Sequence, residues 1–166
     1  MITFEPSVSV VQFSALTAGC LLHIAGQLGI WARNTRSTPD FIFVAYIKER
    51  SRFELQEPVA QSGALSYGSD LVITPNVVAA FDADHPREQT ANALFLDGDR
   101  PLVMLHLSNN DFRMLDLSSG VFDMSRNTST MSGFREWAVC VRAGEELLPM
   151  IDVGPRAALI SGSGRA

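Results

Sequence analysis

The chain has 166 residues, of which 46% are hydrophobic and 19% charged, and its net charge at pH 7 is −5. This length allows a single domain with a substantial core, and the acidic balance opposes broad binding to nucleic acid or to anionic lipid. The apolar surplus favours an interface with another copy of the chain or with a protein partner.

Residues 14–32 form the first long apolar region, and two structures compete for it. A helix would place several of its large apolar side chains on one face. A hairpin explains the glycines better, because Gly26 supplies the turn and Gly29 allows a bulge or a close backbone approach. We therefore favour the hairpin. The glycines, together with His23 and Gln27, also oppose a membrane span.

Apolar runs of two kinds predict the next strands. Residues 41–47 (FIFVAYI) are apolar or aromatic throughout, which is typical of a central strand covered on both faces. Residues 52–56 (RFELQ) alternate, and we expect them to continue the sheet after a turn at residues 49–51.

The following stretch predicts a hairpin and then the one short helix of the chain. Residues 71–74 and 77–81 are apolar runs on either side of a Pro-Asn turn signal. Asp84 is a good helix N-cap and Pro86 fits the first turn, so a helix is expected from residue 85 or 86 to about residue 92.

The densest succession of strand and turn signals lies at residues 91–125. Short apolar runs alternate there with turn segments rich in Gly, Asn, Asp and Ser, which predicts a meander of three or four antiparallel strands. Two later strands are expected at residues 134–142 and 146–153, and Pro149 restricts the second of them to a sheet edge or a bulge.

Together these elements predict an all-β fold, an antiparallel β-sandwich or barrel of about ten short strands with at most one short helix. We expect a single β-rich domain over residues 1–153. Residues 154–166 are rich in Gly, Ser and Arg and are expected to form a disordered C-terminal tail. Cys20 and Cys140 lie in apolar runs and are expected to be buried free thiols, as in a cytoplasmic protein.

The motifs of the common enzyme classes are missing from the sequence. It has no Gly-x-Ser-x-Gly nucleophile elbow, no glycine loop for phosphates and no dinucleotide-binding motif. His23 and His106 lie in apolar runs, where we expect hydrogen-bonded core histidines. The spacing of Cys20 and His23 would suit a metal on a helix but places the two side chains on opposite faces of a strand. The sequence therefore leans away from an enzyme and predicts no metal site, and it leaves any cofactor open.

The densest cluster of potential ligands consists of Asp82, Asp84, His85 and Glu88. If a strand continues through this segment, Asp82 and Asp84 point to one side and can hold a hard cation or place a carboxylate beside an imidazole. The structural alternative is that Asp84 only caps a helix and the other acids are solvated. The cluster is our candidate ligand-binding site, at the mouth of a barrel.

Two further carboxylates, Asp116 and Glu136, fall within strands, on faces shared with apolar side chains. Each can face a cavity with a perturbed pKa. Each can also pair with an arginine such as Arg113, Arg135 or Arg142.

The segment Asp116-Leu117-Ser118-Ser119-Gly120 resembles half of the PilZ signature, Asp/Asn-x-Ser-x-x-Gly, which occurs in β-barrel domains that bind cyclic di-GMP. It has one residue fewer before the glycine. The basic half of that signature, Arg-x-x-x-Arg, is approximated only by Lys48 and Arg52, far upstream. The resemblance covers a handful of residues, and we assign no family from it.

Three functional hypotheses follow. The first is a non-enzymatic, cytoplasmic β-rich module that assembles with itself or binds a protein partner, because of the apolar surplus, the aromatic strand and the missing catalytic motifs. The alternative is a small-molecule- or metal-binding β-barrel, with or without enzyme activity, whose site lies around residues 82–88. The third is nucleic-acid binding, which the net charge opposes. Its candidate residues are Arg33, Arg36, Lys48, Arg50 and Arg52.

Overall fold

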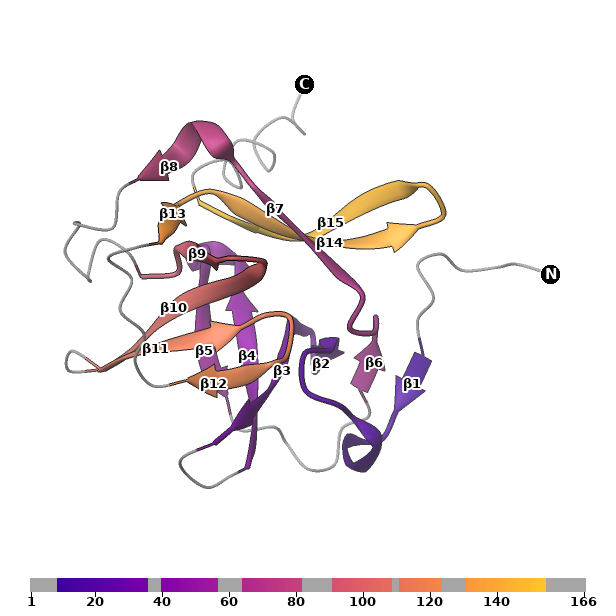
Figure 1. The fold of residues 1–166 in the computed structure, drawn as a ribbon. Helices are drawn as coiled ribbons and strands as arrows, with labels where there is room; N and C mark the ends of the chain where they lie inside the picture. The colour runs from indigo at the N-terminus through magenta and orange to yellow at the C-terminus, as the bar shows by residue number, and fades with distance from the viewer. Residues whose placement is uncertain are drawn as a thin grey trace.

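The computed structural model describes residues 9–35, 40–56, 64–81, 91–108, 111–123 and 131–154. Within these ranges the chain forms fifteen strands in two sheets and three short 3₁₀ helices (Figure 1). All described strand pairs but one are antiparallel. The prediction of an all-β, antiparallel fold is therefore confirmed.

The larger sheet contains twelve of the described strands. In chain order they are β1 (Ser9–Val11), β2 (Leu21–Ile24), β3 (Gln27–Asn34), β4 (Phe41–Ile47), β5 (Arg52–Gln56), β6 (Ala64–Ser66), β8 (Ala80–Phe81), β9 (Leu94–Asp97), β10 (Arg100–Ser108), β11 (Asp111–Asp116), β12 (Val121–Asp123) and β13 (Ser132–Phe134). The smaller sheet contains β7 (Leu71–Pro75), β14 (Trp137–Ala143) and β15 (Glu146–Val153). The 3₁₀ helices are η1 (Phe13–Ala15), η2 (Lys48–Arg50) and η3 (Val77–Ala79).

The apolar region at residues 14–32 contains the hairpin of β2 and β3, and the helical alternative is wrong. Ala25 and Gly26 form the turn with positive φ angles of 48° and 84°. A Cβ atom on Gly29 would lie 2.4 Å from the carbonyl oxygen of Val44. The close approach of β3 to β4 therefore requires glycine at this position, as the sequence indicated.

Strand β4 occupies the predicted central position, between β3 and β5. Its Val44 and Tyr46 belong to the main core cluster, whereas Phe43 and Ala45 pack on the opposite face. That second face is covered by residues of β1, η1 and β6. Burial on both faces explains why the run of apolar residues in β4 has no polar interruption.

Strands β3 to β5 and β9 to β12 curve around a common core and form a barrel (Figure 1). On one side, β12 continues the edge of β3 beyond the end of β2, through parallel pairing at Arg33 and Asn34. On the other side, β5 lies against β10, and Asn92 bridges them. Asn92 Oδ1 accepts the N–H of Phe53 at 2.9 Å, and the N–H of Asn92 donates to the Met104 carbonyl oxygen at 2.7 Å.

The smaller sheet crosses one end of the barrel and shares its core (Figure 1). Trp137, Val139 and Ile151 lie in the same buried cluster as the barrel interior. Trp137 Nε1 also donates to the carbonyl oxygen of Asn92 at 2.9 Å. Pro149 lies in the edge strand β15 next to a shift in register against β14, so its predicted confinement to an edge or a bulge is confirmed.

The hairpin predicted from residues 71–74 and 77–81 is wrong. Strand β7 pairs with β14 instead, and β8 pairs with β13. Between them Asn76 caps η3, because its Oδ1 accepts the N–H of Val78 at 3.2 Å and its Nδ2 donates to Glu136 Oε2 at 2.9 Å. The Pro-Asn pair therefore begins a 3₁₀ turn that leads the chain from the smaller sheet to the larger one.

The meander predicted at residues 91–125 is confirmed, because β9, β10, β11 and β12 pair in succession. Cys20 and Cys140 are buried and free, as predicted. Within the described ranges no helix has both the length and the apolar character needed to cross a membrane.

Two predictions fall largely outside the described residues. They are the helix over residues 85–92, of which only Ala91 and Asn92 are described, and the tail after Gly154. Ala91 and Asn92 lie in a turn. The division into a domain at residues 1–153 and a tail stays a prediction.

Candidate functional site

The four residues predicted to bind a ligand, Asp82, Asp84, His85 and Glu88, lie outside the described residues. That site stays a prediction. Among the residues that the structure does describe, no three His, Cys, Asp or Glu side chains gather closely enough to hold a metal ion. The candidate site comes instead from a cavity that the sequence did not indicate.

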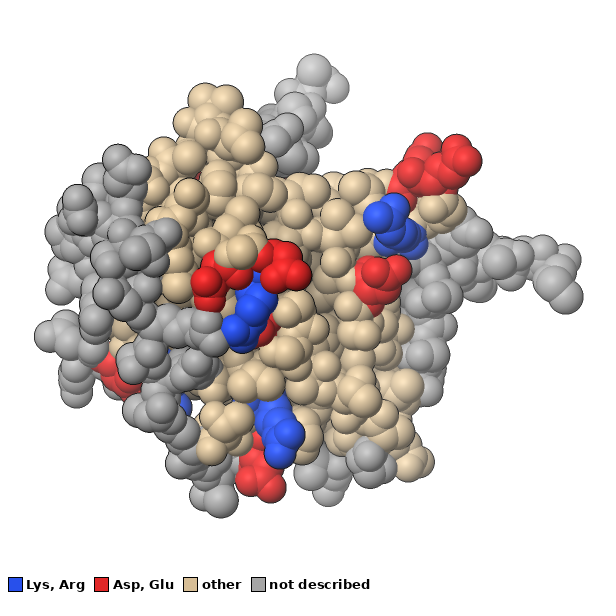
Figure 2. Space-filling model, viewed as in Figure 1, with Lys and Arg blue, Asp and Glu red and all other residues tan. Residues whose placement is uncertain are grey.

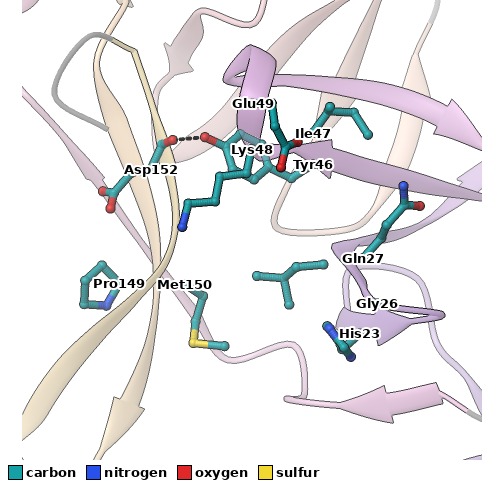
Figure 3. Close-up of a pocket in the computed structure, with 11 residues that line it drawn as sticks. His23, Gly26, Gln27, Tyr46, Ile47, Lys48, Glu49, Pro149, Met150 and Asp152 are labelled. Carbon is teal, nitrogen blue, oxygen red and sulfur yellow. Dashed lines mark hydrogen bonds between the residues drawn. The ribbon is translucent and has the colours of Figure 1, made fainter. Parts of the chain in front are cut away.

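A cavity of about 630 Å³ lies where the smaller sheet meets the barrel. Its walls come from the β2–β3 hairpin, from the end of β4 with η2, and from β15 (Figure 3). We call it the junction pocket. It is lined by His23, Gly26, Gln27, Leu28, Tyr46, Ile47, Lys48, Glu49, Pro149, Met150 and Asp152.

One wall of the junction pocket is fixed by contacts between the end of β4 and the end of β15. The buried Tyr46 hydroxyl donates to the main-chain oxygen of Asp152. Ser51 Oγ lies 3.4 Å from the same Tyr46 hydroxyl oxygen. Ser51 Oγ in turn accepts the N–H of Gly154 at 2.9 Å. Burial raises the pKa of Tyr46, so the hydroxyl stays protonated and can donate at neutral pH. The two sheets are thus joined at the pocket itself.

Lys48 is the only lysine in the chain, and its side chain extends from η2 across the junction pocket (Figure 3). Leu28 of β3 and Met150 of β15 contribute apolar side chains to the lining. His23 of β2 lies on the opposite side of the pocket. None of the ion pairs between described residues involves Lys48. The pocket therefore combines a flexible cationic side chain with a lining that is partly polar and partly apolar.

Two carboxylates, those of Glu49 and Asp152, border the junction pocket. Both lie near Tyr46, at the end of the pocket away from His23 and Gln27 (Figure 3). The described residues that line the His23 end include no carboxylate. The repulsion of an anion by these two carboxylates is therefore weakest toward His23.

The basic residues considered for nucleic-acid binding do not share one surface. Lys48 lines the junction pocket, whereas Arg50 and Arg52 line a different cavity. Arg33 lies in β3, and Arg36 lies outside the described residues. On the face shown in Figure 2, the described acidic and basic side chains occur in small mixed groups. This distribution, like the net charge, opposes binding along a phosphate backbone.

Asp116 is buried, and its hydrogen bonds give it a structural role. Its Oδ2 accepts Arg100 Nε and Nη2 at 3.0 and 2.6 Å, and its Oδ1 accepts the N–H and hydroxyl of Ser118 at 2.9 and 2.6 Å. Burial by itself would raise the pKa of Asp116, but the hydrogen bonds from Ser118 and Arg100 outweigh it and lower the pKa. The segment that resembles half of the PilZ signature is therefore a turn closed on its own carboxylate.

Glu136 and the two histidines singled out from the sequence have different environments. Glu136 accepts Asn76 Nδ2 at 2.9 Å and borders a cavity of only about 80 Å³. His106 is exposed and stacks on Phe112 with ring centroids 4.7 Å apart, so the prediction of a core histidine is wrong there. His106 lies on the outer face of β10, two residues beyond the buried Met104, whereas Leu105 and Leu107 on the other face pack against the main core. His23 is half-buried at the junction pocket.

The junction pocket was missed because its walls come from distant parts of the sequence. Tyr46 and Asp152 have no local pattern that relates them, and only the fold brings them together. One signal was present in the sequence. The single lysine directly follows a central strand in a chain whose other basic residues, apart from histidine, are all arginine. In the sequence, however, Lys48 stands beside Arg50 and Arg52 and is not distinguished from these arginines.

No family model, curated protein or solved structure matches this chain. Function must therefore be argued from the site itself.

Proposed function

We propose that the protein is a non-enzymatic β-barrel module that binds a small amphipathic anion in the junction pocket. The observation that carries this proposal is the Lys48 side chain extended into a cavity of about 630 Å³ that is lined by both polar and apolar side chains. Small-molecule sites have volumes of roughly 300–1,000 Å³ and combine apolar walls with a few polar groups. The junction pocket lies in this range of volume, and Leu28, Ile47, Pro149 and Met150 give it an apolar part beside its polar groups.

The arrangement of polar groups favours binding over catalysis. Lys48 and His23 approach the cavity from opposite sides, so they would flank a ligand rather than act together on one of its atoms (Figure 3). The hydroxyl of Tyr46 is engaged by the backbone of Asp152. An apolar group would rest on Leu28 and Met150, and an acidic group would be held by the Lys48 amine.

The test uses anilinonaphthalene sulfonate, a fluorescent aromatic anion, as the probe. We expect its fluorescence to saturate at one dye per folded chain, and Lys48→Gln to weaken binding about tenfold through loss of a charge-assisted contact. Arg142→Gln removes the same charge from an exposed position in β14 and should leave the affinity unchanged. Equal affinities for the wild type and Lys48→Gln would contradict the proposal.

Assembly through a protein interface is a second candidate function, and one observation favours it. Val77 and Val78 in η3 are 73% and 90% exposed, although the turn that carries them is capped by Asn76. Two adjacent exposed valines on a fixed turn form a small apolar patch that a partner surface could cover. If a second copy covers them, light scattering will give at least a dimer, and Val77→Ser with Val78→Ser will give a monomer. A monomeric wild type would exclude self-assembly.

A further inference from the structure

A second cavity system is separated from the junction pocket by η2. Two adjoining cavities, of about 270 and 520 Å³, share Arg50, Arg52, Ala91 and Asn92 among their lining residues. The smaller cavity also includes Arg135. We call the combined cavity the arginine groove. It is a concentration of positive charge in a chain whose net charge is −5.

The backbone conformation of Ser51 places Arg50 and Arg52 side by side. Ser51 has left-handed dihedral angles, with φ 48° and ψ 44°, and turns the chain between η2 and β5. Its Oγ accepts the N–H of Gly154 at 2.9 Å, which anchors this turn to the end of β15. The two arginines that flank Ser51 therefore start from a fixed backbone.

Arg50 and Arg52 converge on a single carboxylate oxygen. Glu54 Oε1 lies 3.2 Å from Arg50 Nη1 and 2.7 Å from Arg52 Nε. The hydrogen bond from Arg52, assisted by the charges of both arginines, lowers the pKa of Glu54, so the carboxylate is ionised at neutral pH. One carboxylate balances only one of the two guanidinium groups. A positive charge therefore remains at the mouth of the groove.

Arg135 and Asn92 add hydrogen-bond donors to the groove. The Arg135 guanidinium lies over the ring of Phe81, 5.0 Å from its centroid, which restricts its position. Asn92 Oδ1 faces the N–H of Phe53, so the Nδ2 group of the same amide faces away from it. The described residues that line the smaller cavity include no carboxylate.

We propose that the arginine groove binds the phosphate group of a small phosphorylated molecule. Planar guanidinium groups match the oxygens of a phosphate group, and they bind it more strongly than neutral donors do. Asn92, which lines both cavities, supplies a neutral amide donor. The groove is distinct from the junction pocket, so this inference goes beyond the proposed function and does not depend on it.

A small ligand fits the groove better than a nucleic acid does. The positive surplus is confined to a few residues, while the net charge of the chain repels a long polyanion. The cavity of about 270 Å³ is large enough for a phosphate group, and the adjoining cavity of about 520 Å³ can hold the remainder of the molecule.

The proposal is tested by isothermal titration calorimetry of the full chain at one fixed ionic strength. The probes are phenyl phosphate, inorganic phosphate and a short single-stranded oligonucleotide. We expect phenyl phosphate to bind more tightly than inorganic phosphate, because the phenyl group occupies the adjoining cavity, and to keep one site per chain in Lys48→Gln, which lacks the cation of the junction pocket. The oligonucleotide should bind more weakly than phenyl phosphate.

Two variants test the donors, and two control variants test specificity. Arg135→Gln removes a cation. Asn92→Asp keeps the acceptor for Phe53 and suits the left-handed backbone, but it replaces the donor with a carboxylate. Each should weaken binding about tenfold or more. The control Arg142→Gln should leave the affinity for phenyl phosphate unchanged. Lys48→Gln separates the two sites, because phenyl phosphate should still bind in the arginine groove when the cation of the junction pocket is removed.

Three results would overturn the inference. They are the absence of saturable binding to either phosphate, tighter binding of the oligonucleotide than of phenyl phosphate, and an equal loss of affinity in Arg142→Gln and Arg135→Gln. Loss of phosphate binding in Lys48→Gln alone would place the ligand in the junction pocket and would likewise overturn it.

Discussion

Polar side chains supply acceptors to backbone N–H groups where strand pairing ends. Asn92 accepts the N–H of Phe53 at the seam of the barrel, and Asp116 accepts the N–H groups of Ser118 and Ser119 after β11. Asn and Asp are suited to this role because their short side chains reach neighbouring backbone and tolerate turns. A sequence signal for a site and a sequence signal for a turn are therefore easily confused at Asp116.

Replacing Asp116 by Asn tests this structural role. The amide oxygen still accepts the N–H of Ser118, but the charge-assisted pair with Arg100 is lost. The Asp116 side chain of this pair is buried, whereas Arg100 is partly exposed. We expect the free energy of unfolding to fall by about 1–3 kcal/mol in urea titrations. Ligand binding at the junction pocket should not change. A variant as stable as the wild type would contradict the role of this carboxylate.

The ionisation of Asp116 should also make the free energy of unfolding depend on pH. The pKa of Asp116 is lower in the folded chain than its ordinary value of 3.8, so folding favours the ionised form. Its contribution to stability is present above that ordinary value and is lost as the pH falls through the lower folded pKa. Between roughly pH 5 and pH 2 the wild type should therefore lose stability more steeply than Asp116→Asn. Urea unfolding at a series of pH values measures this difference, and parallel curves would contradict it.

Among the elements, β2 and β12 meet end to end along β3, and two glycines allow it. The N–H of Gly19 donates to the Trp31 carbonyl oxygen at 2.8 Å, and the carbonyl oxygen of Gly120 accepts the N–H of Arg33 at 2.7 Å. A Cβ on Gly120 would lie 2.0 Å from the nitrogen of Gly19. The two backbones therefore approach more closely than any side chain permits.

Gly120→Ala should therefore be far more destabilising than Gly98→Ala. Both glycines have positive φ angles, 67° and 65°, so both variants carry the left-handed strain of about 1–2 kcal/mol. A Cβ on Gly98 meets no atom within 4 Å, whereas one on Gly120 collides with backbone. We expect a further loss of at least about 2 kcal/mol in Gly120→Ala, measured by urea denaturation. Equal losses of unfolding free energy in the two variants would show that the end-to-end contact of β2 and β12 does not need glycine.

The elements predicted correctly are those whose signals are local. The Gly26 turn, the apolar run of β4 and the meander from β9 to β12 each depend on residues close together in the sequence. The pairing of β7 with β14 and of β8 with β13 depends on residues far apart, so two adjacent apolar runs were wrongly joined as a hairpin. Neither run contains a residue that identifies its distant partner.

At the scale of the whole molecule, Tyr46 joins the barrel to the smaller sheet. Tyr46→Phe removes only the hydroxyl that donates to the Asp152 main-chain oxygen. We expect the free energy of unfolding to fall by about 1–2 kcal/mol, and amide hydrogens of β15 to exchange faster relative to those of β10. Tyr67→Phe changes the only other tyrosine and is the matched control. The same exchange rates in the two variants would contradict a junction held by Tyr46.

The candidate site could be predicted from the sequence far less well than the fold. The residues proposed from the sequence form one short segment, residues 82–88. A sequence shows directly only those clusters whose members are neighbours in the chain. The junction pocket instead depends on β2, β4 and β15, whose contact is set by the packing of one sheet on the other. Lys48 was visible as the single lysine, but its neighbours across the cavity were not.

The central claim, that Lys48 faces a ligand in the junction pocket, can be measured directly because the chain has only one lysine. In protein labelled with ¹³C-lysine, the side-chain methylene next to the amine reports on this residue alone. During titration with anilinonaphthalene sulfonate, we expect its NMR signal to shift saturably with the dissociation constant obtained from dye fluorescence. A lysine signal that stays fixed while the fluorescence saturates would contradict the proposed site.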